Sequence, residues 1–357
     1  MRHLISISLS CLFLLYGCSD NKEEIELPQD YESEFPTESF IRSHLLTEKG
    51  LIQTNVTNRE NEFLSESLGL YLLFLVERDR ADEFASQVDV LTEHFLHASN
   101  LVSWRLERTN DELTRSPANA WIDDARIVHA LYEAGDAFDE PSYIKLAEQI
   151  GTSLTSIGVK DGIPVDFVDL ATKERGDVLT LSYLDEDALR HMAVNDLYDN
   201  SKQVLSNAPL SDPFFAKSYV ISTQTYQFDE EINMIDQLYV ALRYEQFGLS
   251  TASFYSFFKE TFNDGIVYGR YDLNSKKPTV NYESQAVYAL AIFYLLERDE
   301  RDFAERVMNR LTSSMVSDSS SDYYGGYLDV DTKETHAFDN LLPLLAEGGL
   351  IDGYLIP

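Results

Sequence analysis

Carboxylate residues recur at the start of the most apolar segments of this chain. Glu66 stands between two serines ahead of the apolar stretch 68–76, and Asp123 and Asp124 precede the stretch "ARIVHAL". Four later segments begin in a similar way, with Asp185, Glu186 and Asp187; with Asp229, Glu230, Glu231 and Asp236; with Glu283; and with His336 and Asp339. Carboxylates that face one cleft push one another's pKa values apart, so one stays protonated while another is ionised. Acid and base cleavage of a glycosidic bond requires such a pair.

A structural role also accounts for acids at these positions. Acidic side chains are favoured in the first turn of a helix, where they cap free amide groups and complement the helix dipole. Glu283 and Asp185 are expected to be caps or first-turn charges, and Ser65 fits as the cap of the helix that contains Glu66. The arrangement of the helices therefore decides whether the carboxylates converge.

The acidic residues belong to helices that alternate in character. Apolar residues at helical spacing predict helices over 38–48, 61–78, 81–98, 119–135, 141–155, 182–197, 229–246, 251–262, 282–297, 300–314 and 335–347. These helices form pairs, in which a very apolar first helix is expected to be buried and an amphipathic second helix to cover it. The pairs recur about every 50 to 60 residues, which indicates a repeat architecture.

About six such pairs closed into a ring would give an all-α (α/α)6 barrel, and an open α-solenoid is the alternative. Short β-like strips lie between the helices: "LVSWRLE", "GIPVDFVD", "GIVYGRYDL" and "GGYLDVD". Their regular positions favour the closed barrel, with the strips in loops at one face where a site would be built. Parallel inner helices would then bring their N-terminal carboxylates to one rim.

The start of the chain predicts a secreted lipoprotein. A short basic start precedes an apolar run over 4–16, and the sequence "LYGC" then resembles a bacterial lipobox that ends at Cys18. A run of about 13 apolar residues is too short to span a bilayer and is typical of a secretory leader. We expect a lipoprotein signal peptide over 1–17, an acidic tether over 18–36 and one barrel domain over 37–357.

A lipid on Cys18 would hold the protein at the extracellular face of the bacterial cell membrane, and the membrane would be contacted through this anchor only. The alternative is an ordinary signal peptide with a chance cysteine. Cys11 and Cys18 are the only cysteines in the sequence and both lie in the leader region. The predicted barrel therefore has neither a disulfide nor a cysteine-based site.

Composition limits the partners. The formal net charge of −33 opposes nucleic-acid binding and disfavours a polyanionic substrate, so neutral or cationic partners remain. The sequence has no Gly-rich phosphate loop, no HExxH or GxSxG motif and no EF-hand loop, and "DVDTKE" at 329–334 is predicted to be a turn. We expect no metal, no cofactor and a monomer.

Aromatic residues occur close to the same segments. They are Trp104, Trp121, Tyr183, Tyr226, Tyr239, Tyr268, Tyr271, Tyr282 and Tyr324. The faces of sugar rings stack well on aromatic rings, which are large apolar surfaces. The predicted substrate-binding residues are Trp121, Asp123, Tyr183, Tyr239 and Tyr282, although any single one of these aromatic residues also fits in the core.

Two segments resemble motifs of glycoside hydrolase family 8, an (α/α)6-barrel family of mostly inverting, β-1,4-acting enzymes. "FLSESLGLYLLFLVERDRADEF" resembles the family's "SEGxGYGMLLAVxxxDxxxF", and "ANAWIDDARIVHALYEAGD" resembles "ATDxDLDIAYALxxA". The similarity extends loosely over most of the mature chain. "IDDARI", "NMIDQLYVAL" and "THAFDNLLPLL" resemble a divergent branch of secreted lipoproteins linked to bacterial exopolysaccharide.

The resemblance implies roles for individual residues. Glu66 matches the family's general acid, and Asp124 matches the central Asp that binds and distorts the sugar at the cleavage point. Asp123 then falls on a non-acidic position, although a shift of one residue would exchange the two. The general base is a later Asp, for which Asp236 is the best match, with Glu230 or Glu231 as competitors.

The resemblance predicts an extracellular, lipid-anchored, inverting glycoside hydrolase that trims or depolymerises an exopolysaccharide of the same cell. Ser-Leu-Gly-Leu follows Glu66 where the family has Gly-x-Gly-Tyr-Gly, so a non-catalytic polysaccharide-binding lipoprotein is the first alternative. A polysaccharide lyase is the second alternative. Its base would be a Tyr or His, such as Tyr226 or His336.

Overall fold

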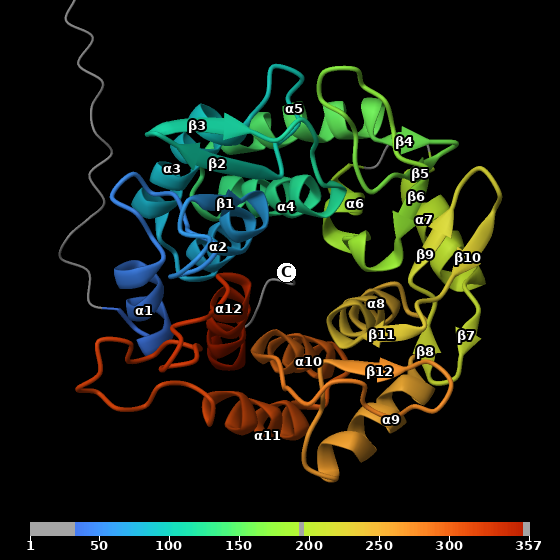
Figure 1. Ribbon diagram of the computed structural model, residues 1–357. Coiled ribbons are helices and arrows are strands. Elements are labelled where there is room, and N and C mark those ends of the chain that lie inside the picture. The colour runs from blue at the N-terminus through green and yellow to red at the C-terminus, as the bar shows by residue number, and fades with distance from the viewer. Residues whose placement is uncertain (1–32, 193–195, 353–357) are drawn as a thin grey trace, which may run out of the picture.

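The structure, a computed structural model, describes residues 33–192 and 196–352. Its inner ring consists of α2 (Ser65–Glu77), α4 (Trp121–Ala137), α6 (Glu186–His191), α8 (Met234–Gln246), α10 (Gln285–Glu297) and α12 (Phe338–Asp352). Neighbouring inner helices pack against each other, and the 3-10 turn Leu181–Tyr183 packs on α8 next to α6. Because α12 packs on α2, the ring is closed (Figure 1). The predicted (α/α)6 barrel is confirmed, and the solenoid is excluded.

The outer ring consists of α1 (Pro36–His44), α3 (Ala81–Val90, continued by a π-helical turn Leu91–Phe95), α5 (Pro141–Ile157), α7 (Leu197–Asn207), α9 (Ala252–Asn263) and α11 (Arg301–Thr312). The two rings differ as the sequence predicts. Every residue of α10 from 286 to 295 is buried, whereas α11 buries only the stripe Phe303, Ala304, Val307 and Leu311. A stripe with this spacing covers one face of a helix, so the outer helices shield the apolar inner ones.

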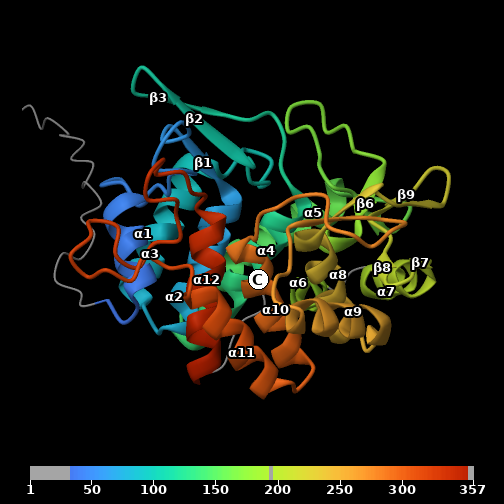
Figure 2. The ribbon, with the colours of Figure 1, turned by 60° about the horizontal axis from the view of Figure 1, so that its bottom comes forward.

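Short antiparallel strands occupy the loops. One three-stranded sheet consists of β1 (Glu62–Leu64), β2 (Arg105–Thr109) and β3 (Glu112–Arg115), and another of β6 (Val178–Thr180), β9 (Ser218–Val220) and β10 (Thr225–Gln227). The other strands form three pairs: β4 (Val159–Lys160) with β5 (Ile163–Pro164), β7 (Leu210–Ser211) with β8 (Phe214–Phe215), and β11 (Glu231–Asn233) with β12 (Arg270–Asp272). Figure 2 shows β1–β3, β6 and β9 toward one end of the ring. β1 and β11 lead directly into α2 and α8, so their pairing fixes where those inner helices begin.

Three predictions of elements are wrong. The strip "GGYLDVD" forms no strand, and α7 was not expected because few apolar residues mark its buried face. Five inner helices begin three to five residues later than predicted, because strands, extended residues or a 3-10 turn precede α2, α6, α8, α10 and α12. The turn at 329–334 is confirmed: Asp329 accepts hydrogen bonds from the amides of Asp331 and Thr332.

Candidate active site

Glu66 lies in the first turn of α2, beside a serine that joins two inner helices. The Ser65 amide donates to the Trp104 carbonyl (3.0 Å), and its hydroxyl donates to Oδ2 of Asp123 on α4 (2.7 Å). The residue before α2 is Leu64, whose side chain caps nothing, so the predicted capping role of Ser65 is wrong. Ser65 instead holds the starts of α2 and α4 together, which places Glu66 and Asp123 side by side.

The second oxygen of Asp123 is bound as well. Nη1 of Arg126, one turn further along α4, donates to Oδ1 at 3.1 Å. Burial and the negative charge of Asp123, opposed by Arg126, together raise the pKa of Glu66 to about 7. Part of the Glu66 side chain remains accessible to solvent. A carboxyl group that keeps its proton near neutral pH and reaches the solvent can act as a general acid.

Asp236 lies in the first turn of α8, directly after β11. It accepts a hydrogen bond from the Ser182 hydroxyl (3.2 Å), and Nζ of Lys217 lies 4.0 Å from Oδ2. Burial raises the pKa of Asp236, whereas Lys217 and Ser182 favour its ionised form. Its side chain is 23% exposed, so a water molecule or a substrate can reach it.

The competing acids are placed differently. Asp229 and Glu231 precede α8 and pair with Lys217 and Arg270, respectively, and Glu230 is exposed. Of the acids in this segment, Asp236 alone projects from the inner helix itself.

Tyr183 shows that the carboxylates converge. It belongs to the 3-10 turn Leu181–Tyr183, and burial raises its pKa. The negative charges of Asp166, Asp123, Asp236 and Glu66 raise it further, so all four lie around this one ring. The structure therefore gathers acids from α2, α4, α8 and one loop at a single rim of the barrel.

A curated protein of Bacillus subtilis (strain 168), named "Putative lipoprotein YdaJ", is 36% identical to this chain over 370 residues. The match covers the full length of both proteins. No family model matches. The chain belongs to the family of this lipoprotein. Solved structures of glycoside hydrolases, family 8 enzymes among them, share its fold, so this member of the lipoprotein family has a family 8-like barrel.

Two of these structures share more than a quarter of their residues with this chain. An α-amylase from Clostridium perfringens shares 26% identity at a TM-score of 0.79, over 87% of this chain and 95% of that one. PssZ from Listeria monocytogenes shares 28% sequence identity at a TM-score of 0.75, over 89% of this chain and 97% of that one. Endoglucanase Cel10 of Klebsiella pneumoniae, a family 8 glycosyl hydrolase, is 14% identical at a TM-score of 0.62, over 87% and 98%, and shares the fold.

In this family 8-like lipoprotein, Asp124 does not reach the cleft. It is fully buried, and its carboxylate accepts hydrogen bonds from the Val102 amide (3.3 Å) and from Nδ2 of Asn119 (3.0 Å). Asn119 in turn accepts from the Val168 amide (2.7 Å). The prediction that Asp124 contacts the sugar is therefore wrong. Asp124 anchors the loops around the start of α4, whereas its neighbour Asp123 lies next to Glu66.

The aromatic candidates differ in how far they are exposed to solvent. Trp121 is fully buried and packs near Gly158, so its predicted role as a sugar platform is wrong. Trp104 is partly exposed next to Ser65, and the Arg105 guanidinium lies 4.9 Å from its ring centre. Tyr282 is half exposed, and Tyr239 is buried beside Arg126. Contact of Tyr183, Tyr239 and Tyr282 with substrate stays a prediction.

The strongest set of potential metal ligands in the described ranges is His129, Asp185 and Asp187, whose ligand atoms lie within 4.8 Å of one another. Asp185 caps α6 by accepting from the Ala188 amide (2.8 Å), which confirms its predicted capping role. The negative charge of Asp185 favours protonated His129, and Arg243 acts on both carboxylates. Two cations thus face two anions, which is a charge-balanced network and a poor site for a divalent ion.

Sequence reasoning missed Arg126, Lys217 and Asp166. The signal for Arg126 is its spacing of three residues from Asp123, which puts both on one face of α4. Lys217 and Asp166 come from loops, so no helical periodicity marks them. Asp166 lies in the strip "GIPVDFVD" and accepts from the amide and hydroxyl of Thr180 (2.5 and 2.7 Å).

Cys18 and nearly all of the predicted leader and tether lie outside the described residues. Across the described ranges, the helices are too short or too polar to cross a bilayer.

Proposed function

We propose that this lipoprotein is an extracellular glycoside hydrolase, anchored through Cys18, that cleaves an exopolysaccharide of the same cell by inversion. The observation that carries the proposal is the rim around Tyr183. There Glu66, with a pKa of about 7, lies next to Asp123, and both acids and the partly exposed Asp236 act on Tyr183. The (α/α)6 fold and the glycoside hydrolases that share it support the same reaction class.

Glu66 is the general acid. At neutral pH about half of the Glu66 side chains carry a proton, since the pKa is about 7. The proton passes to the glycosidic oxygen as the bond to the leaving sugar breaks. The burial that raises the pKa keeps the proton available at neutral pH, where an ordinary glutamate would have lost it.

Asp123 takes the sugar-binding role that the resemblance assigned to Asp124. Ser65 and Arg126 hold its two oxygens, so its orientation is fixed before the substrate binds. A fixed negative charge beside the cleavage point stabilises the positive charge that develops on the sugar ring.

Asp236 is the general base. Lys217 favours its ionised form, and its exposure lets it bind a water molecule. Attack of that water on the face opposite to the leaving group inverts the anomeric centre. This geometry requires acid and base carboxyl groups separated by about 6.5–9.5 Å.

The charge of the chain favours a neutral or cationic glycan as the partner. A formal net charge of −33 and a carboxylate-lined rim would repel a polyuronate or a nucleic acid. The lyase alternative is less favoured, because both of its candidate bases make hydrogen bonds within the protein. The Tyr226 hydroxyl donates to the Val204 carbonyl (2.7 Å), and Nδ1 of His336 accepts from the Phe338 amide (3.1 Å). We propose a monomer that touches the membrane through its lipid only.

The test is to incubate the purified protein with the producer's own exopolysaccharide and to follow product size. Wild type is expected to release fragments, whereas Glu66→Gln, Asp123→Asn and Asp236→Asn are expected to release few or none. Glu148→Gln on the exposed face of α5 is the matched control and should cleave normally. Binding without cleavage by wild type would support the non-catalytic alternative and reject the hydrolase.

A further inference from the structure

Two adjoining cavities extend the rim beyond the candidate catalytic carboxylates. The first, of about 270 Å³, lies between the starts of α8, α10 and α12 and is lined by Asn233, Arg270, Tyr282 and Asp339 among others. The second, of about 260 Å³, lies between the start of α10 and the end of α11, where Arg310, Ser313 and Ser314 line it. Glu283, Ser284 and Gln285 line both cavities, so the two form one groove.

The inner end of this groove adjoins the candidate active site. Asp339 accepts hydrogen bonds from the Ser284 hydroxyl (3.3 Å) and the Ala286 amide (3.2 Å). The charge of Asp339 also raises the pKa of Glu66, so the groove begins close to the general acid. Its outer end reaches α11, which belongs to the outer ring of helices.

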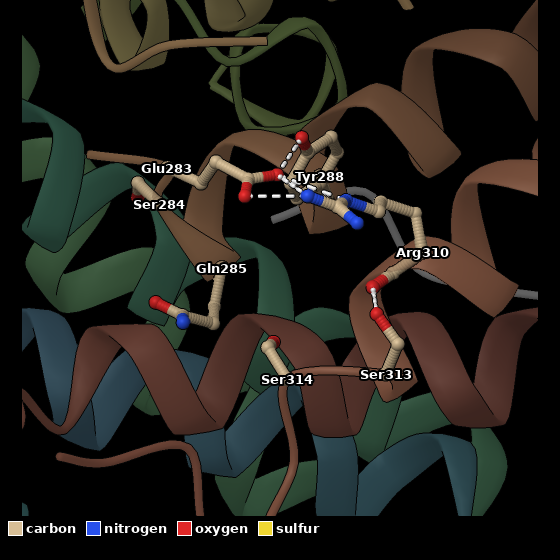
Figure 3. Close-up of a pocket in the computed structure, with 7 residues that line it drawn as sticks. All are labelled: Glu283, Ser284, Gln285, Tyr288, Arg310, Ser313 and Ser314. Atoms are coloured by element: carbon tan, nitrogen blue, oxygen red, sulfur yellow. Dashed lines mark hydrogen bonds and ion pairs between the residues drawn. The ribbon is translucent and has the colours of Figure 1, made fainter. Parts of the chain in front are cut away.

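The floor of the groove is an ion pair. Nε of Arg310 donates to Oε2 of Glu283 at 2.9 Å, a second nitrogen of Arg310 donates to both oxygens, and the Tyr288 hydroxyl donates to the same carboxylate (Figure 3). Glu283 is therefore neither a cap nor a first-turn charge of α10, and the predicted structural role is wrong in its detail. The pair neutralises both charges where the two cavities meet.

Apart from the carboxylate of Asp339 at the inner end, the remaining polar lining carries no unpaired charge. Arg270 is paired with Glu231 (3.1 Å), and serine hydroxyl groups and the side-chain amides of Asn233 and Gln285 supply donors and acceptors. Gln285 makes no side-chain hydrogen bond with the other described residues, and Figure 3 shows its amide turned away from the ion pair. Half-exposed Tyr282 adds an aromatic face at the inner end.

We propose that this groove binds the polysaccharide on one side of the cleavage point, as a run of uncharged sugar rings that passes over the Glu283–Arg310 pair. Each cavity is smaller than the roughly 300 Å³ at which sites for small molecules begin, but the two joined together exceed it. Amide and hydroxyl groups suit sugar hydroxyls, and paired cations offer nothing to a carboxylate. The inference rests on the proposed function, and it implies that the enzyme needs a long polysaccharide chain as its substrate.

The test measures how affinity depends on chain length. Oligosaccharides from partial acid hydrolysis of the exopolysaccharide, separated by size, are titrated by calorimetry into Glu66→Gln, which binds without cleaving. We expect affinity to rise with length until the groove is filled. Adding Ser314→Trp, which fills the outer cavity, should weaken the longest oligosaccharides about tenfold and leave the shortest unchanged. Gln285→Ala should also weaken the binding of the longest oligosaccharides.

Matched controls separate this effect from misfolding. Ser256→Trp and Gln149→Ala change exposed residues of the same type on outer helices and should leave the length dependence intact. Identical length dependence in every variant would overturn the groove. If added salt removed the higher affinity of the long oligosaccharides, the proposal that the ligand is uncharged would be overturned, because salt screens charged contacts only. If wild type cuts the polymer while the groove variants behave normally, the hydrolase stands and only the groove is rejected.

Discussion

The pKa of Glu66 depends on two charges of opposite sign, which makes it testable in two directions. Burial and Asp123 raise it from 4.5 to about 7 against the opposing charge of Arg126, a shift equivalent to about 3 kcal/mol. Removing the cation in Arg126→Met should raise this pKa further, whereas removing the anion in Asp123→Asn should lower it. A single charge within a few ångströms is expected to move the value by roughly one unit or more.

The assay is kcat/KM for release of fragments, measured as a function of pH. The rate falls as pH rises through the pKa of the acid, so the alkaline limb of wild type should lie near pH 7. It should move to higher pH in Arg126→Met and to lower pH in Asp123→Asn, on top of a large loss of rate in the second variant. Arg126→Met leaves the buried Asp123 without its cation, a loss that typically costs about 3–5 kcal/mol of stability. The measurements therefore belong well below the unfolding temperature.

Arg301→Met, which changes an exposed arginine of the outer helix α11, is the control and should keep the wild-type profile. The reasoning is refuted if both variants at the cleft move the alkaline limb in the same direction. It is also refuted if neither moves it, since Glu66 would then not be the group that titrates.

Three further outcomes follow from buried groups. Burial raises the pKa of Glu347 from 4.5 to about 7, so the free energy of unfolding should fall by about 3 kcal/mol as pH rises between these values. Glu347→Gln keeps an acceptor for the Tyr327 hydroxyl and should make the total fall about 3 kcal/mol smaller than in wild type, as denaturant titrations above and below this range would show. Asp124→Ala should cost about 3 kcal/mol of stability in the same titrations and leave kcat of the folded enzyme near wild type. Trp104→Ala should raise KM, whereas Trp121→Phe should not, because only the first ring reaches solvent.

The fold was predictable because its cause is spread over many residues. Inner helices such as α10 are apolar on all sides, and outer helices such as α11 are apolar on one stripe, so the pairing is visible as a period. Where few apolar residues carry the signal the prediction failed, as it did for α7, whose large buried residues are Leu197, Val204 and Leu205. The exact starts of α2 and α8 were missed because strand pairing with distant segments sets them.

Of two adjacent aspartates, the motif match selected Asp124, which is fully buried, whereas Asp123 lies beside Glu66. Asp123 and Asp124 are adjacent, and successive residues of a helix point about 100° apart. The sequence does contain the signal: Asp123, Arg126 and His129 recur at intervals of three, whereas Asp124 shares its face with Ile127, Val128 and Leu131. The first face is polar and the second apolar. A motif match alone cannot separate two neighbouring aspartates, but the face of the helix can.

The polar face of α4 also explains why Asp123 stays at the cleft. Below it, Arg126 donates to Asp123, and His129 lies 3.8 Å from Asp185 at the start of α6, near Arg243 of α8. All of these side chains are buried. Turning α4 by one residue would replace them with apolar groups and leave the charges of its neighbours without partners, at several kcal/mol for each buried ion. Only one rotation of α4 satisfies the whole column, and that rotation points Asp123 toward Glu66.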